Sequence, residues 1–346
     1  MIAEGTLGHP LTSGAEPRTI MVVRLHAFGD AVITLPVIAA LRRRYPNARI
    51  TMITSREYVA LFRAIVDLDD VHGLITRGPR VGRIARLGAL LRRIERPDLL
   101  IDLQRSRLST LFRRLLDPPA WSAIDRFAPR AAVERYRDGV AAAIGRELPL
   151  LYRHPLAPER AAALLERFAL PDDGRPLVCL NPAGCWPTKN WPPERYVALG
   201  RRLIAEHDAR ILLLGTENVA AGAAVLRGGF GDELIDLVGE TTPLEALALM
   251  SRLALIVSDD SGLMHLAWTT GVPTVGLLGA SRATWSRPYG PHTRTIGSED
   301  LPCGACMSPV CARGDRYCLE RIGEVEVAGV CAELLGSSKF SIQNSK

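Results

Sequence analysis

The chain has 346 residues, of which 47% are hydrophobic and 23% are charged, a composition typical of an ordinary soluble globular protein. Its length predicts two domains, each large enough to bury a core of its own. No uninterrupted apolar run reaches the roughly 18 residues of a membrane-spanning helix, so we predict no such helix.

The net charge of +6 is unevenly distributed. Residues 1–150 have 24 Arg and no Lys against 15 acidic residues, a net charge of +9, whereas residues 151–346 have a net charge of −3. Arginine-dense stretches at 83–96 and 105–114 alternate with Leu, Ile and Phe, which is typical of an amphipathic surface facing anionic headgroups or a phosphorylated substrate. A solvated arginine-rich face is the alternative. Nucleic acid is not expected as a partner, because no zinc-finger, RRM-like or KH-like signature is present.

The N-terminal half opens as a βαβ unit. Residues 1–18 lack the basic start and apolar core of a secretion signal, so we expect a disordered extension. A strand at 19–25, an amphipathic helix at 31–45 and a strand at 49–53 follow. Further strands are predicted at 73–76, 99–103 and 121–124.

Turn residues on both sides of a helical stretch at 159–168 mark the connection between the domains. Both halves are predicted to be doubly wound parallel sheets with helices on each face. Two such α/β domains facing each other form a cleft, and ligands bind beyond the carboxyl ends of the strands.

The predicted divisions are an N-terminal domain at 19–155, a linker at 156–176, a C-terminal domain at 177–330 and a tail at 331–346. The predicted C-terminal strands are 177–181, 210–214, 234–237, 253–257 and 274–279.

The junction of a strand and a helix near residue 260 carries the strongest functional signal. Two adjacent aspartates follow the apolar run Leu253–Val257 and precede a predicted helix. Asp260 and Ser261 are both suitable N-cap residues for that helix. Gly262 lets another molecule approach the backbone, and the free N–H groups of the first turn favour phosphate. Ordinary capping explains Ser261 and Gly262, but it explains less well two aspartates and His265 one turn later.

The loop at residues 181–192 is a second candidate for binding phosphate. It contains Gly and Pro, the hydroxyl of Thr188 and the charge of Lys189. The chain has 40 Arg but only three Lys, and Lys189 is the only one before the C-terminal tail. A compact ammonium suits a phosphate site. Glu217, after the next strand, is placed to accept hydrogen bonds from ribose hydroxyls.

An aspartate and a cluster of four cysteines are further candidates for a catalytic or a metal-binding role. Asp30 follows the first strand, where a carboxylate can accept a proton from a hydroxyl, and capping of the next helix is the alternative. Four cysteines in a Gly- and Pro-rich loop are close enough in sequence to bind zinc or iron, and free thiols in a reducing cytosol are the alternative. These cysteines are Cys303, Cys306, Cys311 and Cys318. Neither G-x-G-x-x-G nor the P-loop pattern is present, which argues against a nicotinamide enzyme or an NTPase.

Three segments together resemble glycosyltransferase family 9, the ADP-heptose heptosyltransferases of lipopolysaccharide core assembly. Val22–Asp30 resembles the family's opening motif, Asn181–Pro192 its phosphate loop, and Asp260–Ala267 its signature. The three occur in the same order and spacing as in the family. The cysteine cluster is similar to that of heptosyltransferase II-like members.

The resemblance implies a GT-B fold and inverting transfer of heptose from ADP-heptose to a lipopolysaccharide core acceptor, with no cofactor required for catalysis. It implies that Asp30 is the base that deprotonates the acceptor hydroxyl. An anionic glycolipid acceptor implies a cytoplasmic protein in peripheral contact with the cytoplasmic face of the bacterial inner membrane. The donor-binding residues that the resemblance implies are Thr188, Lys189, Glu217, Asp260, Ser261, Gly262 and His265.

Two alternatives come from other functional classes. A GT-B-like sugar-nucleotide epimerase would use the same nucleotide loop without a lipid acceptor. A non-catalytic member would bind nucleotide or scaffold an envelope-assembly complex. Asp30 argues against the scaffold, because scaffolding needs no base, and analysis of the products separates an epimerase from a transferase.

Overall fold

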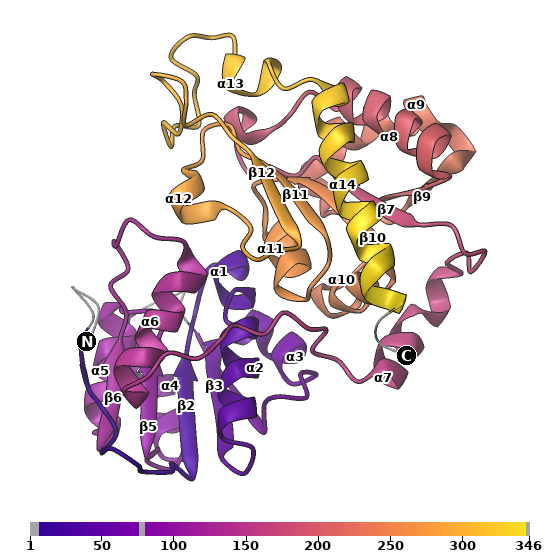
Figure 1. The fold of residues 1–346 in the computed structure, drawn as a ribbon. Helices are drawn as coiled ribbons and strands as arrows, with labels where there is room; N and C mark the ends of the chain where they lie inside the picture. The colour runs from indigo at the N-terminus through magenta and orange to yellow at the C-terminus, as the bar shows by residue number, and fades with distance from the viewer. Residues whose placement is uncertain (1–6, 76–79, 344–346) are drawn as a thin grey trace. The chain divides into compact units, whose positions relative to one another are not determined.

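The computed structural model describes residues 7–75 and 80–343 and divides the chain into two compact units. Unit 1 is Met1–Ala157 and unit 2 is Pro158–Lys346 (Figure 1). The strand order is β1-β6-β5-β2-β3-β4 in the sheet of unit 1 and β12-β11-β10-β7-β8-β9 in that of unit 2. All pairings are parallel except that of β1 with β6. The predicted class, two α/β domains with parallel sheets, is confirmed.

In unit 1, helices cover both faces of the sheet. The strands are β1 (Leu7–His9), β2 (Thr19–Val23), β3 (Arg49–Ser55), β4 (Asp70–Leu74), β5 (Leu99–Asp102) and β6 (Ala120–Ala123). The helices are α1 (Phe28–Val32), α2 (Leu35–Arg44), α3 (Val59–Phe62), α4 (Arg80–Leu91), α5 (Arg107–Leu116) and α6 (Ala132–Ile144). Leu87 of α4 and Phe112 and Leu116 of α5 pack in one cluster with Met21 and Val23 of β2, so α4 and α5 cover the same face.

Unit 2 has the same layered arrangement. Its strands are β7 (Leu177–Asn181), β8 (Arg210–Leu213), β9 (Leu234–Asp236), β10 (Leu253–Asp259), β11 (Thr274–Leu277) and β12 (Thr293–Ile296). Its helices are α7 (Pro158–Leu165), α8 (Pro193–His207), α9 (Ala220–Phe230), α10 (Pro243–Leu249), α11 (Gly262–Thr269), α12 (Ala283–Ser286), α13 (Tyr317–Glu320) and α14 (Glu324–Gln343). Leu199 of α8, Leu226 of α9 and Leu334 of α14 pack in one buried cluster with Val178 and Val257 of the sheet. This cluster is the main core of unit 2.

The structure differs from the predicted domain boundaries in three places. Leu7–His9 form β1, which pairs with β6, where a disordered extension was expected over residues 1–18; residues 1–6 lie outside the described part. Helix α7 packs against α10 and so belongs to unit 2 rather than to a linker. Helix α14 continues to Gln343, within the predicted tail, and packs on α8, β10 and β11. In each case tertiary packing orders a segment that local sequence signals left open.

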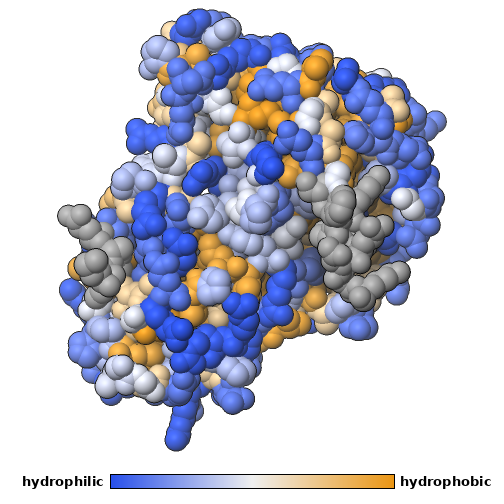
Figure 2. Space-filling model, in the orientation of Figure 1, coloured by the Kyte–Doolittle hydropathy of each residue, from blue (hydrophilic) through white to orange (hydrophobic). Residues whose placement is uncertain are grey.

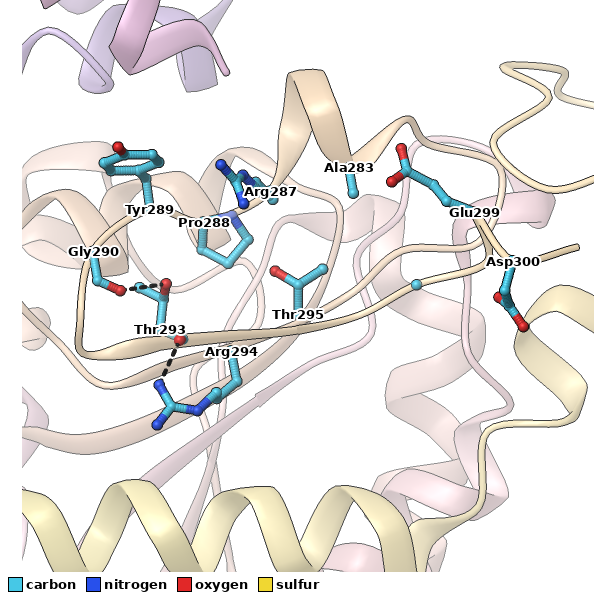
Figure 3. Close-up of a pocket in the computed structure, with 11 residues that line it drawn as sticks. Ala283, Arg287, Pro288, Tyr289, Gly290, Thr293, Arg294, Thr295, Glu299 and Asp300 are labelled. Atoms are coloured by element: carbon cyan, nitrogen blue, oxygen red, sulfur yellow. Dashed lines mark hydrogen bonds between the residues drawn. The ribbon is translucent and has the colours of Figure 1, made fainter. Parts of the chain in front are cut away.

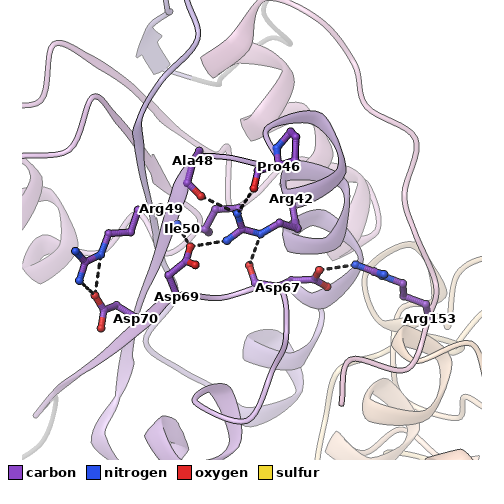
Figure 4. A network of polar contacts seen from close by, with 9 residues as sticks. All are labelled: Arg42, Pro46, Ala48, Arg49, Ile50, Asp67, Asp69, Asp70 and Arg153. Atoms are coloured by element: carbon purple, nitrogen blue, oxygen red, sulfur yellow. Dashed lines mark hydrogen bonds and ion pairs between the residues drawn. The ribbon is translucent and has the colours of Figure 1, made fainter. Parts of the chain in front are cut away.

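Several arginines of unit 1 have structural partners near the amino ends of β3 and β4 (Figure 4). Arg42 donates to the carbonyl of Ala48 at 2.7 Å and to the carboxylate of Asp69 at 2.5 Å. Arg153 pairs with Asp67, whose pKa is raised because burial outweighs the opposing effect of that charge. Ligands of parallel sheets bind at the opposite, carboxyl ends of the strands, so these arginines hold loops together instead.

The drawn face of the protein shows hydrophobic residues interspersed among hydrophilic ones (Figure 2). Within residues 7–75 and 80–343, no helix has the length and hydropathy needed to span a membrane.

Replacement of Leu334 by Ala tests whether α14 is part of the core. Leu334 is 3% exposed, so we expect its truncation to lower the free energy of unfolding by about 2–5 kcal/mol. Val325→Ala on the same helix is the matched control, because Val325 is 60% exposed and its loss should change stability by less than about 0.5 kcal/mol. Denaturant unfolding measures both, and equal midpoints for the two variants would contradict the placement of α14.

Candidate functional site

The carboxyl ends of neighbouring strands bring two predicted segments of unit 2 together. β7 and β10 pair in parallel, with Asn181 opposite Ser258, so the loop at 181–192 begins beside the start of α11. The Asn181 amide donates to the hydroxyls of Ser258 and Ser261, both at 2.8 Å. The candidate donor loop is therefore tied to the helix terminus by side-chain hydrogen bonds.

Lys189 and Asp260 form a buried ion pair at this edge of the sheet. The Lys189 Nζ lies 2.6 Å from Asp260 Oδ2, and the two side chains are 10% and 7% exposed. The Ser281 hydroxyl donates to the same oxygen at 2.5 Å. Burial alone would raise the pKa of Asp260, but His265, Lys189 and the hydrogen bonds from Lys189 and Ser281 outweigh it and lower that pKa. The site therefore contains a carboxylate held ionised by its partners.

The ammonium of Lys189 also lies 4.6 Å from the centre of the Trp186 ring. An ammonium has three N–H donors, and Asp260 accepts from one of them. Within the part of the chain that the structure describes, the other two donors have no protein acceptor, and the contacts with Asp260 and the ring hold the charge of Lys189 in one position.

Helix α11 begins as predicted. Ser261 is its N-cap and accepts a hydrogen bond from the Met264 N–H at 3.2 Å, and Gly262 is the first helical residue. His265 lies in the next turn, with its Nε2 3.7 Å from Asp260 Oδ1. The Trp268 indole donates to His265 Nδ1 at 3.0 Å, so the opposite ring nitrogen, Nε2, faces Asp260. His265 therefore belongs to the same polar cluster.

Asp259, the first of the two adjacent aspartates, has different hydrogen-bond partners from those of Asp260. Its Oδ1 accepts hydrogen bonds from the Trp191 N–H and the Tyr196 hydroxyl, both at 3.1 Å. Burial raises its pKa well above the usual range. Asp259 therefore anchors the end of the candidate donor loop from inside the core. In the sequence, Asp259 was noted only as one of two adjacent aspartates, and nothing there indicated its separate role.

Two other predicted donor-binding residues have less direct positions. The Thr188 hydroxyl is buried and donates to the carbonyl of Ser308 at 2.6 Å, so its proton is already engaged. Glu217 is exposed at the start of a short 3₁₀ helix after β8. Because β8 pairs in parallel with β7, Glu217 follows the same edge of the sheet as the ion pair.

The cysteine cluster does not form the predicted metal site. Among the described residues, which include all four thiols, no group of three or more His, Cys, Asp or Glu side chains is placed to hold a metal ion. Backbone N–H groups, foremost that of Arg316, hydrogen-bond to the Cys311 sulfur and lower the pKa of its thiol, whereas burial raises the pKa of Cys318. Cys303 and Cys306 are exposed. The prediction of bound zinc or iron therefore gains no support from the described residues.

Asp30 is in unit 1, in the first turn of α1, after the end of β2. Its side chain is 39% exposed, and its Oδ2 lies 2.5 Å from the Arg24 guanidinium. Asp30 does not cap α1, because the N-cap is Ala27 and no side chain caps that helix. Arg24 is itself buried and donates to the carbonyl of Leu103 at 2.6 Å. Arg24 stands inside the opening motif, but sequence reasoning assigned it no role.

The protein also has a cavity of about 530 Å³ beside β12 in unit 2 (Figure 3). Arg287, Tyr289 and Thr295 lie on one side of the strand, whereas Arg294 points toward α14, where it approaches Glu333 at 3.7 Å. None of the predicted donor-binding residues lines this cavity. It is a separate feature from the cluster around Lys189.

The chain is similar to several known proteins in sequence and in fold. A curated relative, lipopolysaccharide heptosyltransferase 2 of Salmonella typhimurium, is 27% identical over 308 residues, which cover 80% of this chain and 87% of the relative. Among solved structures, a glycosyltransferase of family 9 from Veillonella parvula has a TM-score of 0.73 at 21% identity, covering 92% of this chain and 97% of the other. The E. coli ADP-heptose LPS heptosyltransferase II has a TM-score of 0.71 at 21% identity, covering 93% and 99%.

These structures show that the two units form the predicted GT-B fold. The sequence model of glycosyltransferase family 9 (heptosyltransferase) matches residues 89–315, about two thirds of the chain. Asp260, Ser261, Gly262 and His265 all lie inside the matched range. The chain belongs to glycosyltransferase family 9, the heptosyltransferases, and is an enzyme of the transferase class.

Proposed function

We propose that the protein transfers a heptose from ADP-heptose to a lipopolysaccharide core acceptor, with inversion at the anomeric carbon. The observation that carries the proposal is the cluster of Lys189, Asp260 and the N-terminus of α11 at the carboxyl end of β10. A pre-oriented ammonium beside free helix N–H groups suits a diphosphate. Two relatives of this chain are named lipopolysaccharide heptosyltransferase 2, which supports the choice of sugar and acceptor.

In this proposal unit 2 holds the donor. The two remaining donors of Lys189 and the first turn of α11 contact the diphosphate, and Glu217 accepts hydrogen bonds from the ribose. Thr188, whose proton is engaged by Ser308, contributes its hydroxyl oxygen and the position of its backbone. As the bond between the anomeric carbon and the diphosphate oxygen breaks, the leaving ADP gains negative charge. Lys189 and the helix terminus stabilise that charge without requiring a catalytic metal.

Unit 1 supplies the base. The acceptor hydroxyl oxygen attacks the anomeric carbon, and its proton passes to Asp30. Because Oδ2 of Asp30 is held by Arg24, we assign the proton to Oδ1. Arg24 lies over the Tyr136 ring at 5.4 Å, and the Tyr136 hydroxyl donates to the backbone carbonyl of Asp30 at 3.3 Å. Arg24 is therefore a positioning residue that fixes which carboxylate oxygen faces the acceptor.

An acceptor built on a lipid also requires the enzyme to work at a membrane surface. We place the protein in the cytoplasm, in peripheral contact with the inner membrane, where ADP-heptose and a nascent glycolipid are both accessible. The excess of arginine in unit 1 supports this, since it favours approach to anionic lipid and phosphorylated sugar.

Replacement of Asp30 by Asn tests the base. The variant keeps the size of the side chain but cannot accept the proton, so we expect kcat for heptosyl transfer to fall about 10²- to 10⁴-fold. ADP affinity, measured by calorimetry, should stay unchanged because the donor residues are in unit 2. Near-wild-type turnover with unchanged donor binding would eliminate Asp30 as the base.

Replacement of Arg24 by Met tests the positioning role. Release of the Asp30 carboxylate should lower kcat about 10- to 100-fold while the KM for the donor stays constant. Arg24→Lys, which keeps a charge near Oδ2, should recover part of the loss. Arg43→Met, at an exposed arginine of α2, is the control. A merely structural role would instead lower thermal stability and leave the turnover of the remaining folded enzyme unchanged.

Replacement of Lys189 by Met tests the donor site. Loss of a charge-assisted contact worth about 1.5–3 kcal/mol should weaken ADP binding roughly 10- to 100-fold. Arg202→Met, at a half-exposed arginine of α8, removes a cation from the same unit and should leave ADP binding unchanged. Titration with ADP and UDP checks selectivity. Wild-type-like ADP affinity in Lys189→Met would remove the main support for the donor site.

A further inference from the structure

One outward surface of unit 1 combines a high positive charge with exposed leucines. The segment 80–117, which contains α4, β5 and α5, has ten arginines and four acidic residues, so its net charge of +6 equals that of the whole chain. α4 and α5 cover the same face of the sheet, since both contribute to the core cluster around β2. Among the described side chains of this segment, five arginines on or next to these two helices are exposed: Arg86, Arg92, Arg93, Arg107 and Arg114.

The two sides of α5 differ in their contacts. Its inner side carries Phe112 and Leu116, which pack in the core, and its N-terminus is closed by a capping box of Ser106 and Ser109. Its outer side carries residues at positions i, i+4, i+7 and i+8, all exposed: Arg107, Leu111, Arg114 and Leu115. Leu111 is 43% and Leu115 is 55% exposed. We call these four residues the α5 outer face.

Most of the acidic side chains in this segment have hydrogen-bond or ion-pair partners outside the α5 outer face. Asp102 is buried at the end of β5 and accepts hydrogen bonds from backbone N–H groups. Asp98 accepts from the N–H groups of Arg18 and Thr19, at the other end of the sheet. Asp117 pairs with Arg96. Arg86, Arg92 and Arg93, by contrast, are exposed on or just after α4. The surface formed by α4 and α5 is thus predominantly cationic.

We propose that the α5 outer face docks on the surface of an anionic lipid bilayer. Leu111 and Leu115 enter the headgroup layer, and Arg107 and Arg114 contact lipid phosphates at the same depth. Helices that lie at a bilayer surface combine an apolar strip with flanking basic residues in this way. Nucleic acid would complement the arginines but not the two leucines, so the combination favours lipid. The inference deepens the membrane contact in the proposed function, but lipid binding needs neither the donor site nor the base.

Vesicle co-sedimentation of the full-length protein tests this surface. Wild type is mixed with vesicles of phosphatidylcholine alone or with a substantial fraction of phosphatidylglycerol. The Leu111→Ser/Leu115→Ser variant removes the apolar strip, and Arg107→Gln/Arg114→Gln removes the charges. Val66→Ser/Arg43→Gln is the matched control, because it changes an equally exposed apolar residue and an exposed arginine elsewhere in unit 1. Thermal unfolding verifies that each variant is folded.

We expect wild type and the control to bind the anionic vesicles and to bind phosphatidylcholine at least 10-fold more weakly. Each α5 variant should bind anionic vesicles about 10- to 30-fold more weakly than wild type. Wild-type-like binding of Leu111→Ser/Leu115→Ser would overturn the proposal, as would absence of wild-type binding to anionic vesicles. Binding of duplex DNA that competes with vesicles and is insensitive to the leucine changes would assign the face to nucleic acid instead.

Activity on a soluble, lipid-free acceptor separates this inference from the proposed function. The α5 variants should retain wild-type turnover on that acceptor, because the proposed donor site is built from residues of unit 2 and the proposed base, Asp30, belongs to α1. Loss of vesicle binding with turnover retained supports the docking face. Absence of turnover in every form, including wild type, with vesicle binding intact would refute the proposed reaction and leave the docking face standing.

Discussion

The buried ion pair between Lys189 and Asp260 is the interaction on which the candidate site depends. Removing two charges from water is costly, and a buried pair is tolerated only where further hydrogen bonds satisfy it. Ser281 and His265 surround the carboxylate, and the Trp186 ring covers part of the ammonium. Such an arrangement contributes little to stability compared with a well-packed apolar pair. In the proposed donor site, the arrangement holds a cation in one position before the diphosphate binds.

The choice of lysine at this position has a physical basis. A guanidinium spreads its charge over a planar fork and suits bidentate contacts, whereas an ammonium concentrates the charge and directs three donors around one atom. One donor can stay on Asp260 while the others reach a diphosphate, so binding need not break the pair. In a chain with 40 Arg, the single Lys before the C-terminal tail occupies the position to which the proposed donor site assigns that geometry.

The sequence allowed the unit of β10 and α11 to be predicted closely, because a buried apolar run, a serine N-cap and a glycine are local signals. The pairing of Lys189 with Asp260 was not predictable in the same way, since it joins residues 71 positions apart. The role of Asp259 was hidden because its acceptor contacts, with Trp191 and Tyr196, lie 68 and 63 positions away in the sequence. β1 and β12 were missed because short edge strands carry little periodicity. Helix α14 was taken for a tail because its order depends on packing against the sheet rather than on caps.

The arginines of unit 1 have at least three tasks that composition cannot separate. Arg42 and Arg153 tie loops near the amino ends of the strands (Figure 4), and Arg24 holds the carboxylate of Asp30. Arg86 of α4 and Arg107 and Arg114 of α5 are exposed to solvent. Burial and partners distinguish them, and both appear only in the folded chain.

The most direct measurement of the proposed reaction is product analysis after incubation with ADP-heptose, with and without a lipopolysaccharide core acceptor. Heptosyl transfer predicts that ADP forms only when the acceptor is present, in an amount equal to the heptosylated acceptor, and that the new linkage has the inverted anomeric configuration. Formation of an altered free sugar nucleotide without acceptor, or no consumption of ADP-heptose in either mixture, would contradict it.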